Sequence, residues 1–154
     1  MAIYRLERTQ QIPAPAKQVW AFIASPLSLG EITPPYMQFE ITSAGLPETL
    51  YAGMLICYNV RPLLSARLKW VTEITQVKEP DYFVDIQHKG PFRSWHHQHL
   101  FRAIAGGVEM SDVVHYQPPL GILGRMANRL FLKKQLDDLF DYRRAKIEER
   151  FGKF

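Results

Sequence analysis

The chain has 154 residues, of which 47% are hydrophobic and 12% aromatic, as is typical of a folded globular protein. We expect a single domain over residues 1–154 with one sizeable core. The sequence has no apolar run long enough to span a bilayer and no signal-peptide pattern. The single cysteine, Cys57, excludes an internal disulfide and a cysteine metal cluster. These features predict a cytoplasmic protein.

The formal net charge is +4, which is mildly basic and permits an acidic partner without identifying one. Positive charges gather in the last third of the chain, where they alternate with Asp and Glu as on a solvated helix face. The sequence has no nucleic-acid-binding motif and no glycine-rich phosphate loop. We therefore predict no nucleic-acid partner.

The N-terminal quarter predicts one strand and two short helices. A polar-rich alternating strand covers residues 3–12 and ends at a pair of prolines. An apolar stripe that includes Trp20 and Phe22 predicts a helix at residues 14–24. A second short helix or turn is expected at residues 27–32, before Pro34-Pro35 stops it.

The rest of the chain predicts an antiparallel meander followed by one long helix. Short alternating runs separated by turns predict strands at residues 37–43, 53–60, 66–77, 82–88, 92–102 and 108–116. A loop at residues 61–64 is expected to carry an exposed apolar tip, Leu63 and Leu64. From residue 120 or 122 to 151 the chain lacks proline and has helical apolar spacing. This helix is the only predicted element long enough to cover one face of the sheet.

The last two predicted strands carry an unusual set of polar and aromatic residues. Alternation places Trp95, His97, His99 and Phe101 on one face of the first strand. If Gly106-Gly107 is a hairpin turn, that face lies beside the face of the second strand that carries Met110, Asp112, Val114 and Tyr116. A mostly apolar wall with a few polar groups is what a small-molecule pocket needs.

The order of elements and several motifs resemble the START-like or SRPBCC superfamily, and more narrowly its small bacterial CoxG-like ligand-binding branch. The motifs are Gly90-Pro91-Phe92-Arg93, the two strand faces just described, Pro119-Leu120-Gly121, Leu123-Gly124-Arg125, Arg129-Leu130-Phe131 and Phe140-Asp141-Tyr142-Arg143. The resemblance implies an α+β helix-grip fold, in which a curved seven-stranded antiparallel sheet wraps a long C-terminal helix. It also implies a cavity for a hydrophobic small molecule such as a lipid, an isoprenoid quinone or a polyketide. It carries over no catalytic residue and no cofactor.

The residues predicted to bind the ligand come from the two strand faces, one further strand and the helix. They are Trp70, Trp95, His97, His99, Phe101, Met110, Asp112, Val114, Tyr116, Met126 and Leu130. Each tryptophan can equally be ordinary core packing. We expect one imidazole to be hydrogen-bonded to Asp112 or Tyr116, as a satisfied polar group in the wall.

Three alternatives remain open at this point. The His97-x-His99 pair has the spacing of a metal chelate, with Asp112 or His96 as a third ligand, but it lacks the glutamate of the cupin pattern, and we expect no metal. With Asp112 the pair could instead do acid–base work in a small cyclase or hydratase. A closed cavity would indicate an interaction module. Arg125, Arg129 and Lys133 could contact a membrane surface transiently, and the protein could be a monomer or a homodimer.

Overall fold

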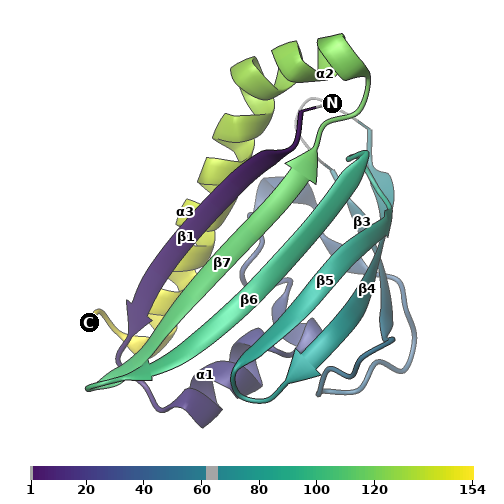
Figure 1. Ribbon diagram of the computed structural model, residues 1–154. Helices are drawn as coiled ribbons and strands as arrows, with labels where there is room; N and C mark the ends of the chain where they lie inside the picture. The colour runs from purple at the N-terminus through teal and green to yellow at the C-terminus, as the bar shows by residue number, and fades with distance from the viewer. Residues whose placement is uncertain (1, 62–65) are drawn as a thin grey trace.

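A curved antiparallel sheet of seven strands, in the order β1-β7-β6-β5-β4-β3-β2, forms the framework (Figure 1). The computed structural model describes residues 2–61 and 66–154, so the expected apolar tip at Leu63 and Leu64 lies outside the described residues. The strands are β1 (Tyr4–Ile12), β2 (Glu40–Ile41), β3 (Leu55–Val60), β4 (Leu68–Lys78), β5 (Tyr82–Lys89), β6 (Ser94–Ile104) and β7 (Gly107–Gln117). Strands β3 to β7 are the predicted meander, and β1 closes it by pairing with β7. The strand expected at residues 37–43 shortens to β2.

The helices lie on one side of this sheet and at its two ends (Figure 1). They are α1 (Ala16–Ile23), the short 3₁₀ helices η1 (Pro26–Ser28) and η2 (Pro35–Met37), α2 (Gly121–Ala127), the π-helical turn η3 (Asn128–Leu132) and α3 (Lys133–Phe151). The predicted C-terminal helix is therefore one run of three segments. Helix α3 runs behind β1 and β7, while α1 and α2 lie at opposite ends. None of the helices within residues 2–61 and 66–154 is long and apolar enough to cross a bilayer.

The β6–β7 hairpin depends on two glycines. Gly106 turns with a φ of +83°, a conformation that glycine adopts without a Cβ penalty. Its neighbour Gly107 lies so close to β1 that an added Cβ would be 2.0 Å from the carbonyl oxygen of Ile12. The hairpin pairs His99 with Asp112 and Trp95 with Tyr116, so the two predicted strand faces do lie side by side.

Two hydrophobic clusters hold the helices on the sheet. At the α1 end, Trp20 packs edge-on against Phe83 and Phe101, with ring centroids 5.7 and 5.3 Å away. Around the N-terminal half of α3, Leu136 and Phe140 pack with Trp70, Trp95 and Tyr116. Helix α3 is tied to β1 by an ion pair between Arg8 and Asp137 and by a hydrogen bond from Gln10 Nε2 to the Arg144 carbonyl, 3.1 Å. The sheet, α1 and α3 together surround the space described next.

Candidate functional site

A cavity of about 500 Å³ lies between the sheet and the C-terminal helical segments. This volume is within the range of small-molecule pockets. Apolar and aromatic side chains dominate the lining, including Ile23, Leu29, Ile32, Met37, Ile56, Trp70, Phe92, Trp95, Leu123, Phe131, Leu136 and Leu139. Polar side chains also reach it, chiefly Tyr58, Thr72, Asp85, His97, His99, Gln135 and Arg143. The cavity therefore has apolar walls with a small number of polar groups.

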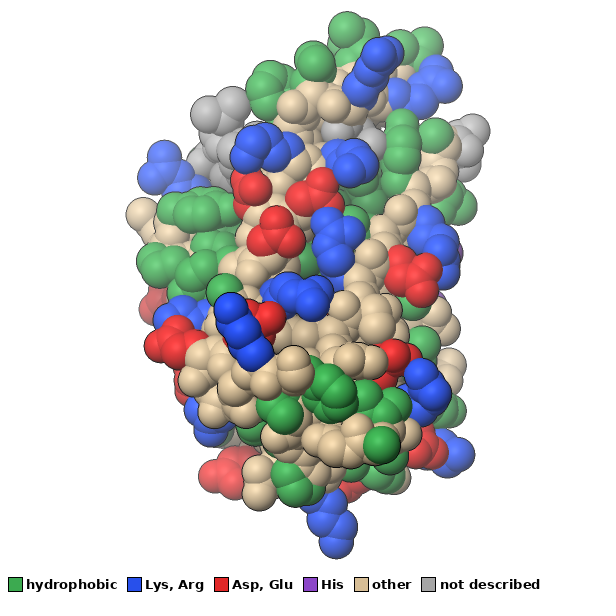
Figure 2. All heavy atoms as spheres, turned by 90° about the vertical axis from the view of Figure 1, so that its left-hand side faces the viewer, with side chains coloured by type: hydrophobic (Ala, Val, Ile, Leu, Met, Phe, Trp, Pro, Cys, Tyr) green, Lys and Arg blue, Asp and Glu red, His purple; other side chains and the backbone are tan. Residues whose placement is uncertain are grey.

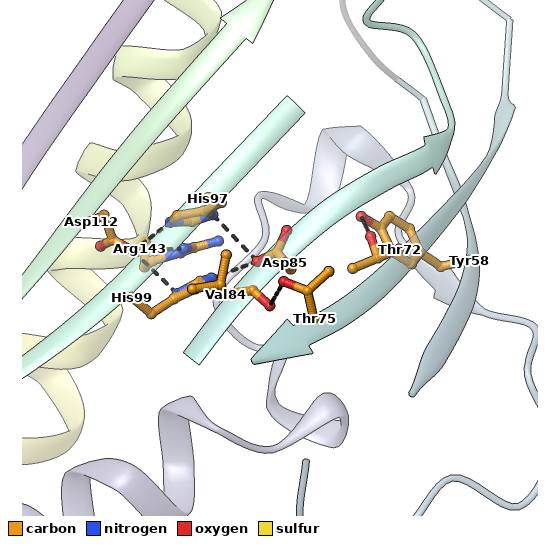
Figure 3. Close-up of polar contacts among 9 residues, drawn as sticks. All are labelled: Tyr58, Thr72, Thr75, Val84, Asp85, His97, His99, Asp112 and Arg143. Carbon is orange, nitrogen blue, oxygen red and sulfur yellow. Dashed lines mark hydrogen bonds and ion pairs between the residues drawn. The ribbon is translucent and has the colours of Figure 1, made fainter. Parts of the chain in front are cut away.

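Strand register gathers four of the polar residues at one place on the sheet. His97 and His99 are two residues apart on β6 and so point to the same, inner face. Asp85 of β5 pairs with His97, and Asp112 of β7 pairs with His99. The two imidazoles thus lie between two carboxylates, one on each neighbouring strand (Figure 3).

Each imidazole donates a short hydrogen bond to a different carboxylate. His97 Nε2 lies 2.7 Å from Asp112 Oδ1, and His99 Nε2 lies 2.6 Å from Asp85 Oδ2. The second nitrogens are farther away, with His97 Nδ1 3.8 Å from Asp85 and His99 Nδ1 3.4 Å from Asp112. The rings stack with centroids 3.7 Å apart, and Phe83 stacks on the other side of His99 at 3.9 Å. This polar cluster of Asp85, His97, His99 and Asp112 is almost completely enclosed.

Arg143 of α3 adds a positive charge to the polar cluster. Its Nη1 lies 3.8 Å from Asp112 Oδ1, and its guanidinium stacks over the Phe140 ring at 4.9 Å. When one of the two histidines is protonated, its charge and that of Arg143 together balance the two carboxylates. Such balance matters because an unpaired charge is costly in a buried site.

The carboxylates and imidazoles shift one another's protonation. Burial alone would raise the pKa of Asp85, but the contacts with His99, His97 and Arg143 outweigh burial and lower it. The pKa of Asp112 is likewise lowered, since its contacts with both histidines outweigh its burial. Burial, with the charge of His99, lowers the pKa of His97. In His99 burial is outweighed by the contacts with Asp112 and Asp85, so its pKa is raised. His99 is thus the histidine that takes up the first proton.

Three buried hydrogen-bond donors in the cavity lining lack acceptors. Within the part of the chain that the structure describes, Trp70 Nε1, Gln135 Nε2 and Arg143 Nε have no hydrogen-bond partner. All three residues line the cavity. Buried donors are nearly always paired, so these are the groups available to acceptor atoms placed in the cavity.

Comparison with known proteins identifies the fold. No family model matches the chain, and no curated protein matches its sequence. Solved structures do match: a Mycobacterium smegmatis protein (17% identity, 97% of this chain and 98% of that chain, TM-score 0.65) and a Thermus thermophilus protein (18%, 97% and 97%, 0.66). The ginseng major latex-like protein 151 from Panax ginseng matches with a TM-score of 0.69 at 13% identity, covering 97% of each chain. The chain has the Bet v 1-like helix-grip fold. This result confirms the fold class predicted from the sequence.

The helix-grip cavity brings together some of the residues predicted to bind ligand and leaves others outside its lining. Trp70, Trp95, His97 and His99 line it. Asp112 makes the expected hydrogen bond to an imidazole but lies outside the lining. The others outside the lining are Phe101 and Met110, in the core around α1, Val114 and Tyr116, in the core under α3, and Met126 and Leu130, which are exposed to solvent.

Asp85 and Arg143 belong to the site but are absent from the residues predicted to bind ligand. Asp85 shares a strand face with Phe83, and a buried aromatic two residues away was the available signal. Arg143 lies three residues after Phe140 and four before Ile147, on the buried stripe of α3. The helical spacing therefore placed Arg143 on the inner face, although its contact with Asp112 could not be read from it.

The polar cluster also has the residue types of a metal site. Asp85, His97 and His99 each offer one ligand atom, and these atoms lie within 4.8 Å of one another. Two imidazoles and one carboxylate suit a first-row transition metal. However, the two rings are inclined by only 25°, whereas a metal ion lies near the plane of each imidazole that binds it. Binding one ion would therefore require a ring to turn away from its carboxylate.

Proposed function

We propose that this protein binds, and carries, a hydrophobic small molecule in the helix-grip cavity. The observation that carries the proposal is the cavity of about 500 Å³ with its largely apolar and aromatic lining. A lipid, an isoprenoid quinone or a polyketide-like compound has the apolar surface that such walls favour. The proposal covers one domain over residues 1–154 and requires no cofactor.

The polar end of the cavity supports a ligand that also carries oxygen acceptors. Trp70 Nε1, Gln135 Nε2 and Arg143 Nε offer donors without acceptors among the described residues. Of these, Arg143 belongs to the polar cluster through Asp112, so an oxygen-bearing group at that end of an otherwise apolar molecule would accept from it. We therefore propose that the ligand's carbonyl, hydroxyl or carboxylate group lies beside the polar cluster and its apolar part lies between α1 and β3.

Native mass spectrometry of the purified protein, followed by organic extraction, tests this proposal. We expect release of a hydrophobic compound at one per chain. The variant Leu139→Trp would place a larger side chain in the cavity, and it should reduce the bound fraction. Leu100→Trp is the matched control, since Leu100 lies on the outer face of β6. A protein that is empty and also fails to bind lipids, quinones and polyketides would refute the carrier proposal.

A second candidate function is acid–base catalysis of the cyclase or hydratase type. The observation that favours it is that His97, His99 and Asp85 line the same cavity, with a carboxylate orienting each imidazole. The test is whether the extracted compound, returned to the protein, is converted to a product of different mass or connectivity. Conversion with a pH–rate profile that His97→Ala and His99→Ala abolish supports the enzyme. An unchanged compound supports carriage alone.

A further inference from the structure

Large hydrophobic side chains are unusually exposed where the chain passes from β7 into α3. Thirteen large hydrophobic side chains are exposed among the described residues, and six of them lie within residues 120–131. They are 49% to 76% exposed and form a surface that we name the apolar end face: Leu120, Ile122, Leu123, Met126, Leu130 and Phe131. Scattered apolar residues are normal on a surface, but a contiguous group of this kind indicates an interaction site.

Basic residues outnumber acidic ones around the apolar end face. Residues 113–136 contain Arg125, Arg129, Lys133 and Lys134 but no Asp or Glu. Lys133 and Lys134 pair with Asp137 and Asp138, whereas Arg125 and Arg129 form no ion pair with the part of the chain that the structure describes. Figure 2 shows hydrophobic and basic side chains at the end formed by α2, with the acidic side chains farther down the molecule. An apolar surface with basic neighbours is typical of helices that lie in the interface of an anionic membrane.

A groove next to the apolar end face adds a place for anionic headgroups. It has a volume of about 550 Å³ and lies between the start of β1 and α2. Of its nine lining residues, Arg5, Arg125, Arg129 and Lys133 are basic, and none is acidic. The same groove contains Ile122 and Met126. Apolar contacts and positive charges are therefore presented to the same side of the molecule.

We propose that the apolar end face is a docking surface for an anionic lipid bilayer, and that the helix-grip cavity opens toward that bilayer. Leu120, Leu123 and Phe131 are exposed and also line the cavity, so they form part of its rim. A hydrophobic molecule leaving between them would enter the acyl-chain region without crossing water. The π-helical turn η3 lies in this rim, and such turns are frequent at functional sites.

The alternative occupant of this face is a second copy of the chain. A two-fold interface places the same patch on both partners, so Arg125 and Arg129 of each copy would meet like charges of the other. Asp137 and Asp138 already pair with Lys133 and Lys134 and do not offset this repulsion. Lipid phosphates supply the opposite charge, and the observations therefore favour a bilayer.

Vesicle co-sedimentation of the full chain tests the proposal directly. We expect binding to vesicles of phosphatidylcholine mixed with phosphatidylglycerol, weaker binding to phosphatidylcholine alone, and weakening by added salt. Neutralising two basic residues should weaken binding about 25-fold, at about fivefold per charge. Removing three apolar contacts should weaken it by at least about tenfold. The variants are Arg125→Gln with Arg129→Gln, and Ile122→Ser with Met126→Ser and Leu130→Ser.

Matched controls make the same changes elsewhere on the surface. Lys17→Gln with Lys153→Gln removes two exposed charges, and Leu27→Ser with Tyr51→Ser and Leu55→Ser removes three exposed apolar side chains. Both controls should bind as the wild type does. Three results overturn the proposal: no binding to either vesicle, binding that the end-face variants retain, or a solution dimer that the triple serine variant dissociates. Because the readout needs no ligand, it is independent of what the cavity carries.

Discussion

Replacing Asp112 by Asn probes the charge balance of the polar cluster. Asp112→Asn keeps the size of the side chain and an oxygen that can accept from His97, but it removes one of two buried negative charges. In the wild type both carboxylates favour the protonated form of His99, since their contacts outweigh burial and raise the His99 pKa. In the variant, the negative charge of Asp85 is already balanced by the positive charge of Arg143. We therefore expect His99 to lose its proton at a lower pH than in the wild type.

The distances give the size of the effect. Two unit charges separated by the 3.4 Å between His99 Nδ1 and Asp112 Oδ1 interact by about 5 kcal/mol at an effective dielectric constant of about 20. Arg143, at 3.8 Å, loses a similar attraction. Because removing Asp112 also removes its desolvation penalty, we expect the net loss of unfolding free energy to be about 3–5 kcal/mol, as for other broken buried pairs.

The loss should depend on pH in a defined direction. A histidine whose folded pKa is raised stabilises the fold below the unfolded value of about 6.5, and that contribution disappears as the pH rises through the raised value. The contribution from the lowered pKa of Asp112 is complete above about pH 4 and is lost as the pH falls below that value, so it does not change between about pH 5.5 and 8.5. The variant should therefore differ most from the wild type at about pH 5.5 and differ less at about pH 8.5.

Urea unfolding of both proteins at the two pH values measures this difference. Asp81→Asn, which breaks the exposed Lys78–Asp81 pair, is the control and should change the free energy of unfolding by less than about 1 kcal/mol at either pH. NMR titration of the wild type should also show one buried imidazole titrating above its ordinary pKa and one below it. Equal stability of Asp112→Asn and the wild type at about pH 5.5, or a difference that does not change with pH, would refute this reasoning.

Two further predictions concern stability alone. Ile147 is fully buried under the sheet, so Ile147→Ala should lower the free energy of unfolding by about 2–5 kcal/mol, whereas Ile122→Ala, at an exposed position, should change it by less than about 0.5 kcal/mol. Gly107→Ala would bring a Cβ to 2.0 Å from the Ile12 carbonyl oxygen and should lower the thermal midpoint, while Gly30→Ala, where the nearest atom is 3.8 Å away, should lower it far less. Thermal and urea unfolding of the four variants checks both, and equal effects within either pair would contradict the packing described above.

Much of the framework was predictable because its signals are local. Alternation with period two is a property of the extended chain itself, so it placed His97 and His99 on one face before any tertiary contact was known. A short hairpin then identified the partner strand, but the register came from the structure: the turn is at Ala105-Gly106 rather than the expected Gly106-Gly107, and this shift puts Asp112 beside His99. The long C-terminal helix followed in the same way from helical spacing and the absence of proline.

The extent of the cavity was not predictable, because volume depends on side chains that are distant in sequence. Phe101 shares a strand face with His97 and His99, and the sequence offered no reason to separate them. In the folded protein, Trp20 from α1 packs against Phe101 and covers it. Phe101 is therefore left out of the cavity lining, although Ile23 and Phe83 from the same end belong to it.

Within the polar cluster, too, some features were predictable from the sequence and others were not. The sequence by itself determined that His97, His99 and Asp112 lie on neighbouring inner faces of one hairpin, because strand alternation relates residues that are close along the chain. Only the tertiary structure decided that Asp85 completes the cluster and that Arg143 balances its charge. The position of Asp85 depends on the pairing of β5 with β6, and the position of Arg143 depends on the rotation of α3 over the sheet. Both are set by packing across the whole core, which no local pattern encodes.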